Sequence, residues 1–222
     1  MTTVALAGGS GVVGALTLRH LLAREQVRLV VAVSRRLLPG TDEKLVTRIV
    51  GRWSEEAIAS ELPEGVAVAV SCLGTTMKQA GSKGAFRAVD HDAVVAFAAA
   101  ARARGARRFL LVSSMGASAR SRSFYLRTKG EAEEALARLG YPQLTIVRPS
   151  FIDDQGARRE FRLAERLGLP LARAVFSVLG RRSRYAPISA DVIARALVRL
   201  ALDETDERVR FVESDRLHAV GA

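Results

Sequence analysis

Short runs of apolar residues alternate along the chain with longer stretches in which apolar residues recur every three or four positions. The short runs are rich in β-branched residues and too continuous for strands with one face in solvent, so they predict a parallel sheet covered on both faces. They lie at residues 4–7, 27–33, 45–50, 66–71, 108–113 and 144–147. The longer stretches predict helices at residues 12–23, 55–61, 86–104 and 124–139. Strands that alternate with helices predict an α/β fold, a doubly wound parallel sheet with helices on both faces.

The last third of the chain continues the helical pattern. Residues 157–179 read as a helix broken at Gly168 and Pro170, and residues 189–202 as an amphipathic helix that Ser189 can cap. Neither an internal repeat nor a linker interrupts the sequence. We therefore expect one domain over residues 1–222, with the part from about residue 152 onward as a small C-terminal extension.

Composition excludes several classes of protein. Hydrophobic residues make up 49% of the 222 residues and charged residues 26%, which is ordinary for a globular chain. Apolar stretches fall short of the roughly 18 residues of a membrane span, and the N-terminus shows no leader pattern, so we expect a cytosolic protein. The single cysteine, Cys72, excludes an intramolecular disulfide, and three scattered histidines give no metal-site pattern.

The formal net charge of +11 is the most unusual bulk property. A surface this basic attracts nucleic acid and anionic membranes. The arginines, however, are spread along the chain in short pairs such as Arg107 and Arg108, without a basic tail or interleaved aromatic residues that would stack on bases. We expect a solvated surface with one functional anion site and no specific nucleic-acid partner.

A glycine-rich turn directly follows the first predicted strand. It consists of Gly8, Gly9, Ser10, Gly11, Val12, Val13 and Gly14. Glycines here let backbone N–H groups approach a pyrophosphate that side chains would block, and the helix that follows offers its positive N-terminal end. The spacing Gly9-x-Gly11-x-x-Gly14 matches the general dinucleotide fingerprint. A tight turn without a ligand is the alternative.

The end of the second predicted strand reads Ser34-Arg35-Arg36. Proteins selective for NAD usually place Asp or Glu there to bind the ribose hydroxyls. A hydroxyl followed by two guanidiniums instead suits a 2′-phosphate, which it would hold through charge-assisted hydrogen bonds. This segment favours NADP(H) as the cofactor, unless both arginines belong to the general excess.

Tyr125 and Lys129 lie four residues apart, hence on one face of the predicted helix at residues 124–139. An ammonium beside a phenol stabilises the phenolate, so the phenol can exchange a proton with a substrate carbonyl or alcohol during hydride transfer. Ser113 or Ser114, at the end of the preceding strand, is placed to orient the same oxygen. The pattern Tyr-x-x-x-Lys is common by chance. The nearby serines and the glycine-rich turn make a proton-transfer role the better interpretation here.

Together these residues resemble the short-chain dehydrogenase/reductase superfamily of Rossmann-fold proteins, and within it the atypical branch around the Tat-interacting, metastasis-suppressor-like oxidoreductases. The resemblance runs from Val4 to about Ile152. Its most specific segments are SCLGTT (71–76), FRAVD (86–90), FLLVSSMGA (109–117), YLRTKGE (125–131) and VRP (147–149). The resemblance implies that Leu73, Gly74 and Thr75 lie along an NADP(H) cofactor and that Pro149 flanks its nicotinamide. From the order of the elements along the chain, we expect the C-terminal extension to lie on the substrate side.

The chain also departs from that family. Residues 50–53 read VGRW where relatives often have an acidic residue near the adenine, and Ser114 is closer to Tyr125 than is typical, so Ser113 stays open beside the favoured Ser114. We interpret Cys72 as a packed strand-end residue rather than a nucleophile. The Asp90-His91-Asp92 cluster is better read as a solvated helix start or a packing position than as a metal site.

The leading interpretation is an NADP(H)-dependent oxidoreductase that transfers hydride to a small carbonyl-containing or unsaturated substrate. Tyr125 would be the acid/base, Lys129 would tune it and hold the ribose, and Ser114 would orient the substrate. The alternative is a regulatory protein in which bound NADP(H) stabilises a surface that partner proteins recognise. Fold alone does not separate the two. The sequence leaves the oligomeric state open.

Overall fold

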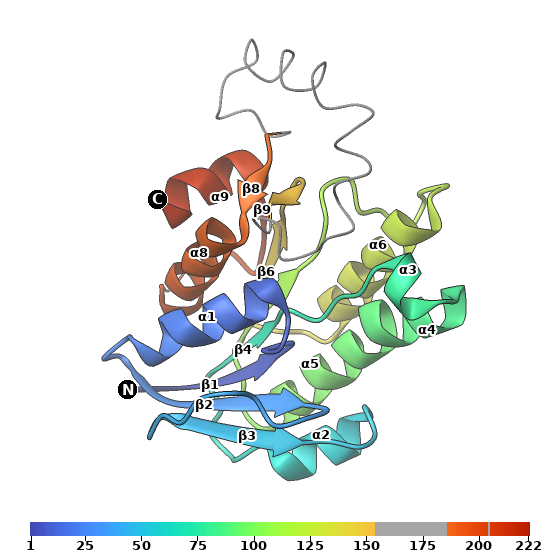
Figure 1. The fold of residues 1–222 in the computed structure, drawn as a ribbon. Coiled ribbons are helices and arrows are strands. Elements are labelled where there is room, and N and C mark those ends of the chain that lie inside the picture. The colour runs from blue at the N-terminus through green and yellow to red at the C-terminus, as the bar shows by residue number, and fades with distance from the viewer. Residues whose placement is uncertain (154–185, 204) are drawn as a thin grey trace.

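A seven-stranded parallel sheet forms the middle layer of the molecule, in the strand order β3-β2-β1-β4-β5-β6-β9 (Figure 1). The computed structural model describes residues 1–153, 186–203 and 205–222. The strands of the sheet are β1 (Thr2–Ala7), β2 (Val27–Ser34), β3 (Leu45–Ile49), β4 (Val68–Ser71), β5 (Arg108–Val112), β6 (Gln143–Arg148) and β9 (Val209–Glu213). A separate short pair joins β7 (Ile152–Asp153) to β8 (Ile188–Ser189). The predicted doubly wound α/β fold is confirmed.

Helices cover both faces of the sheet (Figure 1). One face carries α1 (Val12–Leu22), α8 (Ala190–Leu202) and α9 (Ser214–Gly221), and the other carries α2 (Glu55–Glu61), α5 (Ala93–Ala103) and α6 (Phe124–Arg138). Two short helices, α3 (Met77–Ala80) and α4 (Lys83–Arg87), precede a π-helical turn, η1 (Ala88–Asp92).

Strand β1 shows why its apolar run is continuous. Successive side chains of a strand point to opposite faces. Val4 and Leu6 therefore pack into the core under α1 and α8, while Ala5 and Ala7 pack into the core under α5. All four side chains are fully buried.

The order of the strands reverses at β1, which lies between β2 and β4. Ala7, the last residue of β1, is paired with Val33 on one side and with Ser71 on the other. In open parallel sheets, ligands bind beyond the carboxyl ends of the strands at this kind of reversal. The turn after β1 and the loop after β4 therefore meet at the place where a ligand is expected.

The structure refines several predicted elements. The helix expected over residues 86–104 forms, but it contains the π-helical turn η1 between α4 and α5. Strand β3 is an edge strand whose end is open to solvent, not a strand buried on both faces, and Ile49 is 55% exposed. Helix α8 packs against α1 and the sheet, and the expectation that the C-terminal part lies on the substrate side stays a prediction.

Other expectations about the C-terminal part have mixed outcomes. Ser189 caps α8 as expected, since its hydroxyl accepts a hydrogen bond from the backbone N–H of Val192. Strand β9 and helix α9 were not predicted. The broken helix expected over residues 157–179 lies outside the described residues.

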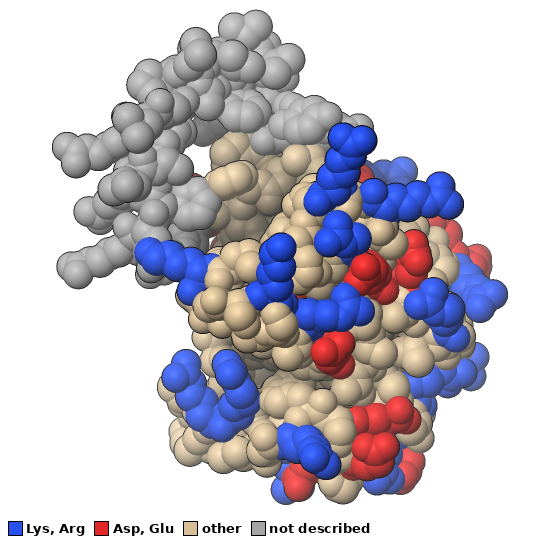
Figure 2. Space-filling view, turned by 90° about the vertical axis from the view of Figure 1, so that its right-hand side faces the viewer, with Lys and Arg blue, Asp and Glu red and all other residues tan. Residues whose placement is uncertain are grey.

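Charged side chains are mixed over the surface shown in Figure 2, where Lys and Arg stand singly or in small groups among Asp and Glu. This agrees with the dispersed arginines of the sequence. In the described part of the chain, no helix has the length and hydropathy needed to span a membrane.

Gly130 tests how closely α6 packs on the loop that precedes it. A Cβ atom at Gly130 would lie 2.2 Å from the carbonyl carbon of Ser118 and 2.3 Å from the nitrogen of Ala119. We expect Gly130→Ala to lower the free energy of unfolding by about 1–3 kcal/mol, because backbone must move to admit the methyl group. Urea denaturation measures the change.

Gly84→Ala is the matched control, because a Cβ at Gly84 in α4 would meet no atom within 4 Å. This variant should unfold at the same urea concentration as the wild type or slightly higher, since alanine favours a helix. Equal stability of the two variants would contradict the close packing of Gly130 on the backbone of Ser118 and Ala119.

Candidate functional site

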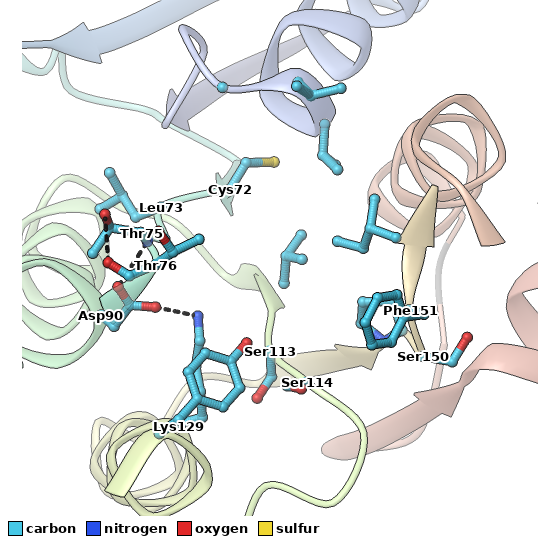
Figure 3. A pocket seen from close by; sticks show the side chains of 18 of the residues that line it. Cys72, Leu73, Thr75, Thr76, Asp90, Ser113, Ser114, Lys129, Ser150 and Phe151 are labelled. Atoms are coloured by element: carbon cyan, nitrogen blue, oxygen red, sulfur yellow. Dashed lines mark hydrogen bonds and ion pairs between the residues drawn. The ribbon is translucent and has the colours of Figure 1, made fainter. Parts of the chain in front are cut away.

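A cavity of about 430 Å³ opens at the carboxyl ends of the central strands (Figure 3). Its walls come from the turn after β1, the loop after β4, the end of β5, helix α6 and the segment after β6. The lining residues are 11–13, 72–77, 90, 112–114, 125, 129 and 149–152. Most sites predicted from widely separated parts of the sequence thus share one cavity.

Close contact between backbones explains the glycines of the turn. Gly8 has a φ of +84°, and a Cβ atom there would lie 2.5 Å from the carbonyl carbon and oxygen of Cys72. A Cβ at Gly14 would lie 2.0 Å from the carbonyl oxygen of Gly8. The turn is thereby held against both α1 and the loop after β4. Gly11 caps α1 without a side-chain hydrogen bond, which leaves the positive end of the helix facing the cavity.

The predicted cofactor residues fall into three groups. Those that line the cavity are Gly11, Val12, Val13, Leu73, Gly74, Thr75, Ser113, Tyr125, Lys129 and Pro149. Gly8, Gly9, Ser10 and Gly14 complete the turn but are not part of the cavity lining. The third group, at residues 34–36, lies outside the cavity at the end of β2.

The segment after β2 lies against the glycine turn. Leu38 is buried there, and its Cδ1 atom is 2.8 Å from the position that a Cβ of Gly9 would take. The hydroxyl of Ser34 accepts a hydrogen bond from the backbone N–H of Arg36, at 3.4 Å. Both Arg35 and Arg36 are exposed. The two arginines are therefore exposed to solvent, two and three residues before the side chain that contacts the glycine turn.

The Lys129 side chain, which lines the cavity, is paired with a buried carboxylate. Its ammonium forms an ion pair with Asp90 at 2.7 Å, and both side chains are almost fully buried. Asp90 also accepts a hydrogen bond from the backbone N–H of Thr75 at 2.8 Å. Asp90 is therefore neither a solvated helix start nor a metal ligand, and we missed it as a site residue. The signal was its position on the same helical face as the buried Phe86 and Val94.

The two serines at the end of β5 have different partners. Ser113 is buried, and its hydroxyl donates a hydrogen bond to Glu133 of α6 at 2.5 Å. Ser114 makes only a 3.4 Å contact to the carbonyl of Met115. Since the proton of Ser113 is already donated, Ser114 has the hydroxyl better able to reach a ligand in the cavity.

Glu133 is held in turn by Arg148 of β6. Arg148 donates from Nε to Glu133 at 3.0 Å and forms a second hydrogen bond with the other carboxylate oxygen. This hydrogen bonding raises the pKa of Arg148, and Glu213 adds to the effect. The network fixes Ser113, α6 and β6 relative to one another.

Cys72 behaves as a packed residue. Burial raises the pKa of its thiol to about 12, so the thiol stays protonated at neutral pH. The thiol also donates a weak hydrogen bond to the hydroxyl of Thr17, 3.9 Å away. A neutral, half-buried thiol is a poor nucleophile. Over the described residues, His, Cys, Asp and Glu form no group able to hold a metal ion.

Comparisons with known proteins show the family of this chain. Residues 8–204 match the model of a family described as NAD(P)H-binding. "Protein fmp52, mitochondrial" of Emericella nidulans is 35% identical over 209 residues, which cover 91% of this chain and 88% of that protein. "Protein FMP52, mitochondrial" of Eremothecium gossypii is 32% identical over 207 residues, which cover 93% of this chain and 92% of that protein.

Solved structures show the same fold. MoeE5 in complex with UDP-glucuronic acid and NAD has a TM-score of 0.67 at 18% identity, covering 94% of this chain and 75% of that one. A short chain dehydrogenase family protein from Francisella tularensis has a TM-score of 0.67 at 13% identity. The match covers 97% of this chain and 98% of that one. The family model confirms the predicted NAD(P)-binding family and the solved structures confirm the fold, whereas the Tat-interacting branch stays a prediction.

The relatives contradict the expected cytosolic location. Both curated relatives are named as mitochondrial proteins, which points to the mitochondrion instead. The expectation was wrong because it rested on the lack of a leader pattern, and such an absence does not establish where a protein works.

Replacing Glu133 tests the network behind the cavity. Glu133→Gln removes a nearly buried charge, and among the described residues it leaves Arg148 with the 3.6 Å ion pair to Glu213 and the ring of Phe211. Because breaking a buried ion pair leaves the other charge uncompensated, we expect a loss of about 3 kcal/mol in the free energy of unfolding. Denaturant unfolding followed by circular dichroism measures it.

Glu134→Gln is the control, because Glu134 is exposed and its ion pair with the exposed Arg138 is 3.9 Å long. That change should cost less than about 0.5 kcal/mol. A similar, small effect of both substitutions would show that the network does not hold α6 in place.

Proposed function

Because this chain belongs to the NAD(P)H-binding family, we propose that it is an NADP(H)-dependent oxidoreductase that transfers hydride to a small carbonyl-containing or unsaturated substrate. The observation that carries the proposal is the single cavity, which brings the glycine turn, the loop after β4 and the Ser114, Tyr125 and Lys129 side chains together. A binding turn alone would suit any dinucleotide protein. A phenol, an ammonium and a hydroxyl in the same cavity as that turn provide groups for proton transfer in addition to cofactor binding.

Each of these side chains has a task in the proposed reaction. Bound NADPH supplies the hydride. Tyr125 donates its phenolic proton to the substrate oxygen as the C–H bond forms, and Ser114 donates a hydrogen bond that orients the same oxygen. Lys129 stabilises the phenolate that remains, until solvent returns the proton. The apolar Val112 and Pro149 form the adjoining wall, against which a flat ring can pack.

The preference for the phosphorylated cofactor rests on residues 34–36. Arg35 and Arg36 are exposed next to the glycine turn, where a 2′-phosphate on the adenosine ribose would lie. The strand end carries no carboxylate that would repel this phosphate. Guanidiniums form strong, often paired hydrogen bonds with phosphate.

Cofactor choice is tested with Arg35→Ala/Arg36→Ala. We expect the variant to bind NADPH at least about 100-fold more weakly, because it loses two guanidiniums and each charge-assisted hydrogen bond contributes about 1.5–3 kcal/mol. NADH binding should change little. Isothermal titration calorimetry with both dinucleotides measures the difference, and Arg24→Ala, after the far end of α1, is the control. Equal losses for NADPH and NADH would refute the assigned role.

Turnover is tested with Tyr125→Phe. The variant should bind NADPH like the wild type but oxidise it at least about 100-fold more slowly, since general acid catalysis contributes that much. The assay follows NADPH absorbance with a panel of aldehydes, ketones, quinones and enones. Ser114→Ala should slow the reaction more than Ser113→Ala. If wild-type protein binds NADPH but oxidises it with no member of the panel, a regulatory protein that holds the cofactor without turnover becomes the better account.

A further inference from the structure

The buried Asp90–Lys129 ion pair is not accounted for by the proposed reaction. Asp90 belongs to the π-helical turn η1, and Lys129 to the middle of α6. Their side chains are 0% and 6% exposed, and the charged atoms are 2.7 Å apart. Burial of a charge is costly unless the charge is paired, so this pair has one well-defined geometry.

Both oxygens of the Asp90 carboxylate are used. Oδ1 faces the ammonium of Lys129, and Oδ2 accepts the backbone N–H of Thr75 (Figure 3). Thr75 belongs to the loop that follows β4 and lines the cavity. Gly74 passes directly beside the pair, since a Cβ there would be 3.5 Å from both Asp90 Oδ1 and Lys129 Nζ. One carboxylate thus joins the cofactor loop to the catalytic helix.

The segment around Asp90 also contacts Tyr125. Phe86, four residues before Asp90, is fully buried, and its ring centroid lies 5.5 Å from that of Tyr125. The π-helical turn lies between α4, which carries Phe86, and α5. Turns of this kind are frequent at functional sites. The same short segment therefore positions the ring of Tyr125 and the ammonium of Lys129.

We propose that Asp90 is a positioning residue, whose carboxylate fixes the ammonium of Lys129 beside Tyr125 and ties it to the loop that would bind the cofactor. This inference rests on the proposed oxidoreductase function. Without the carboxylate, the four-carbon side chain of Lys129 has no fixed partner at its tip. Small displacements of catalytic groups lower the rate strongly.

The charge of Asp90 leads to a test that separates positioning from mere structural support. A carboxylate in the cavity wall repels the phosphates of a dinucleotide, so its removal should not weaken cofactor binding. Its removal should nevertheless slow the chemical step. A merely structural residue would instead affect binding and turnover together.

Asp90→Asn is the decisive variant, because the amide keeps an oxygen for the N–H of Thr75 but loses the charge. We expect NADPH to bind as tightly as to the wild type or more tightly, and kcat to fall by about tenfold to 100-fold. Asp92→Asn is the control on the same turn, since Asp92 is exposed and pairs with His91. An unchanged kcat, or parallel losses of NADPH binding and kcat, would overturn the proposal.

A double-mutant cycle in ligand-free protein keeps the proposal testable if Asp90→Asn folds poorly. Asp90→Asn and Lys129→Met each leave one buried charge unpaired, and the double variant leaves none. We expect the folding equilibrium constant of the double variant to be at least about tenfold higher than the value expected if the two single substitutions acted independently. If the two substitutions changed the free energy of unfolding additively, Asp90 and Lys129 would not interact, and the proposal would be wrong. This readout needs no cofactor, so failure of the wild type to bind NADPH would reject the oxidoreductase proposal separately.

Discussion

Three backbone segments approach one another so closely at the turn after β1 that side chains have no room between them. The position of a Cβ at Gly8 falls 2.5 Å from the carbonyl of Cys72, and that of Gly14 falls 2.0 Å from the carbonyl oxygen of Gly8. Strand β1, helix α1 and the loop after β4 are therefore locked in one arrangement at the reversal of strand order. This arrangement turns the N-terminus of α1 and the loop at residues 73–75 toward the same cavity, and every other proposed role depends on it.

Helix α6 completes the site because buried charges hold it on two sides. Lys129 is paired with Asp90 on the side of the loop after β4, and Glu133, one turn later, is paired with Arg148 of β6. Gly130, between them, allows contact with the backbone at Ser118. Paired buried charges contribute little net stability, but they disfavour any arrangement that would separate them. The helix can thus present Tyr125 to the cavity in a fixed position.

The central strands, the glycine turn and the Tyr125–Lys129 helix could be predicted because each leaves a local pattern in the sequence. Strand β9 could not, since Val209 and Phe211 are partly exposed on an edge strand and only Val212 is fully buried. The π-helical turn and the role of Asp90 also escaped prediction, because the partner of Asp90 lies on another helix. The different hydrogen bonds of Ser113 and Ser114 depend on Glu133, which is distant in sequence as well.

The most direct test of the account is where NADPH binds. Isotope-labelled protein can be titrated with NADPH while backbone amide signals are followed by NMR. If NADPH occupies the cavity, the largest shifts occur at residues 9–13 and 73–75, with smaller ones at 34–36. No shift at saturating NADPH, or shifts confined to a different surface such as the groove between α6 and β9 that Phe211 lines, would contradict it.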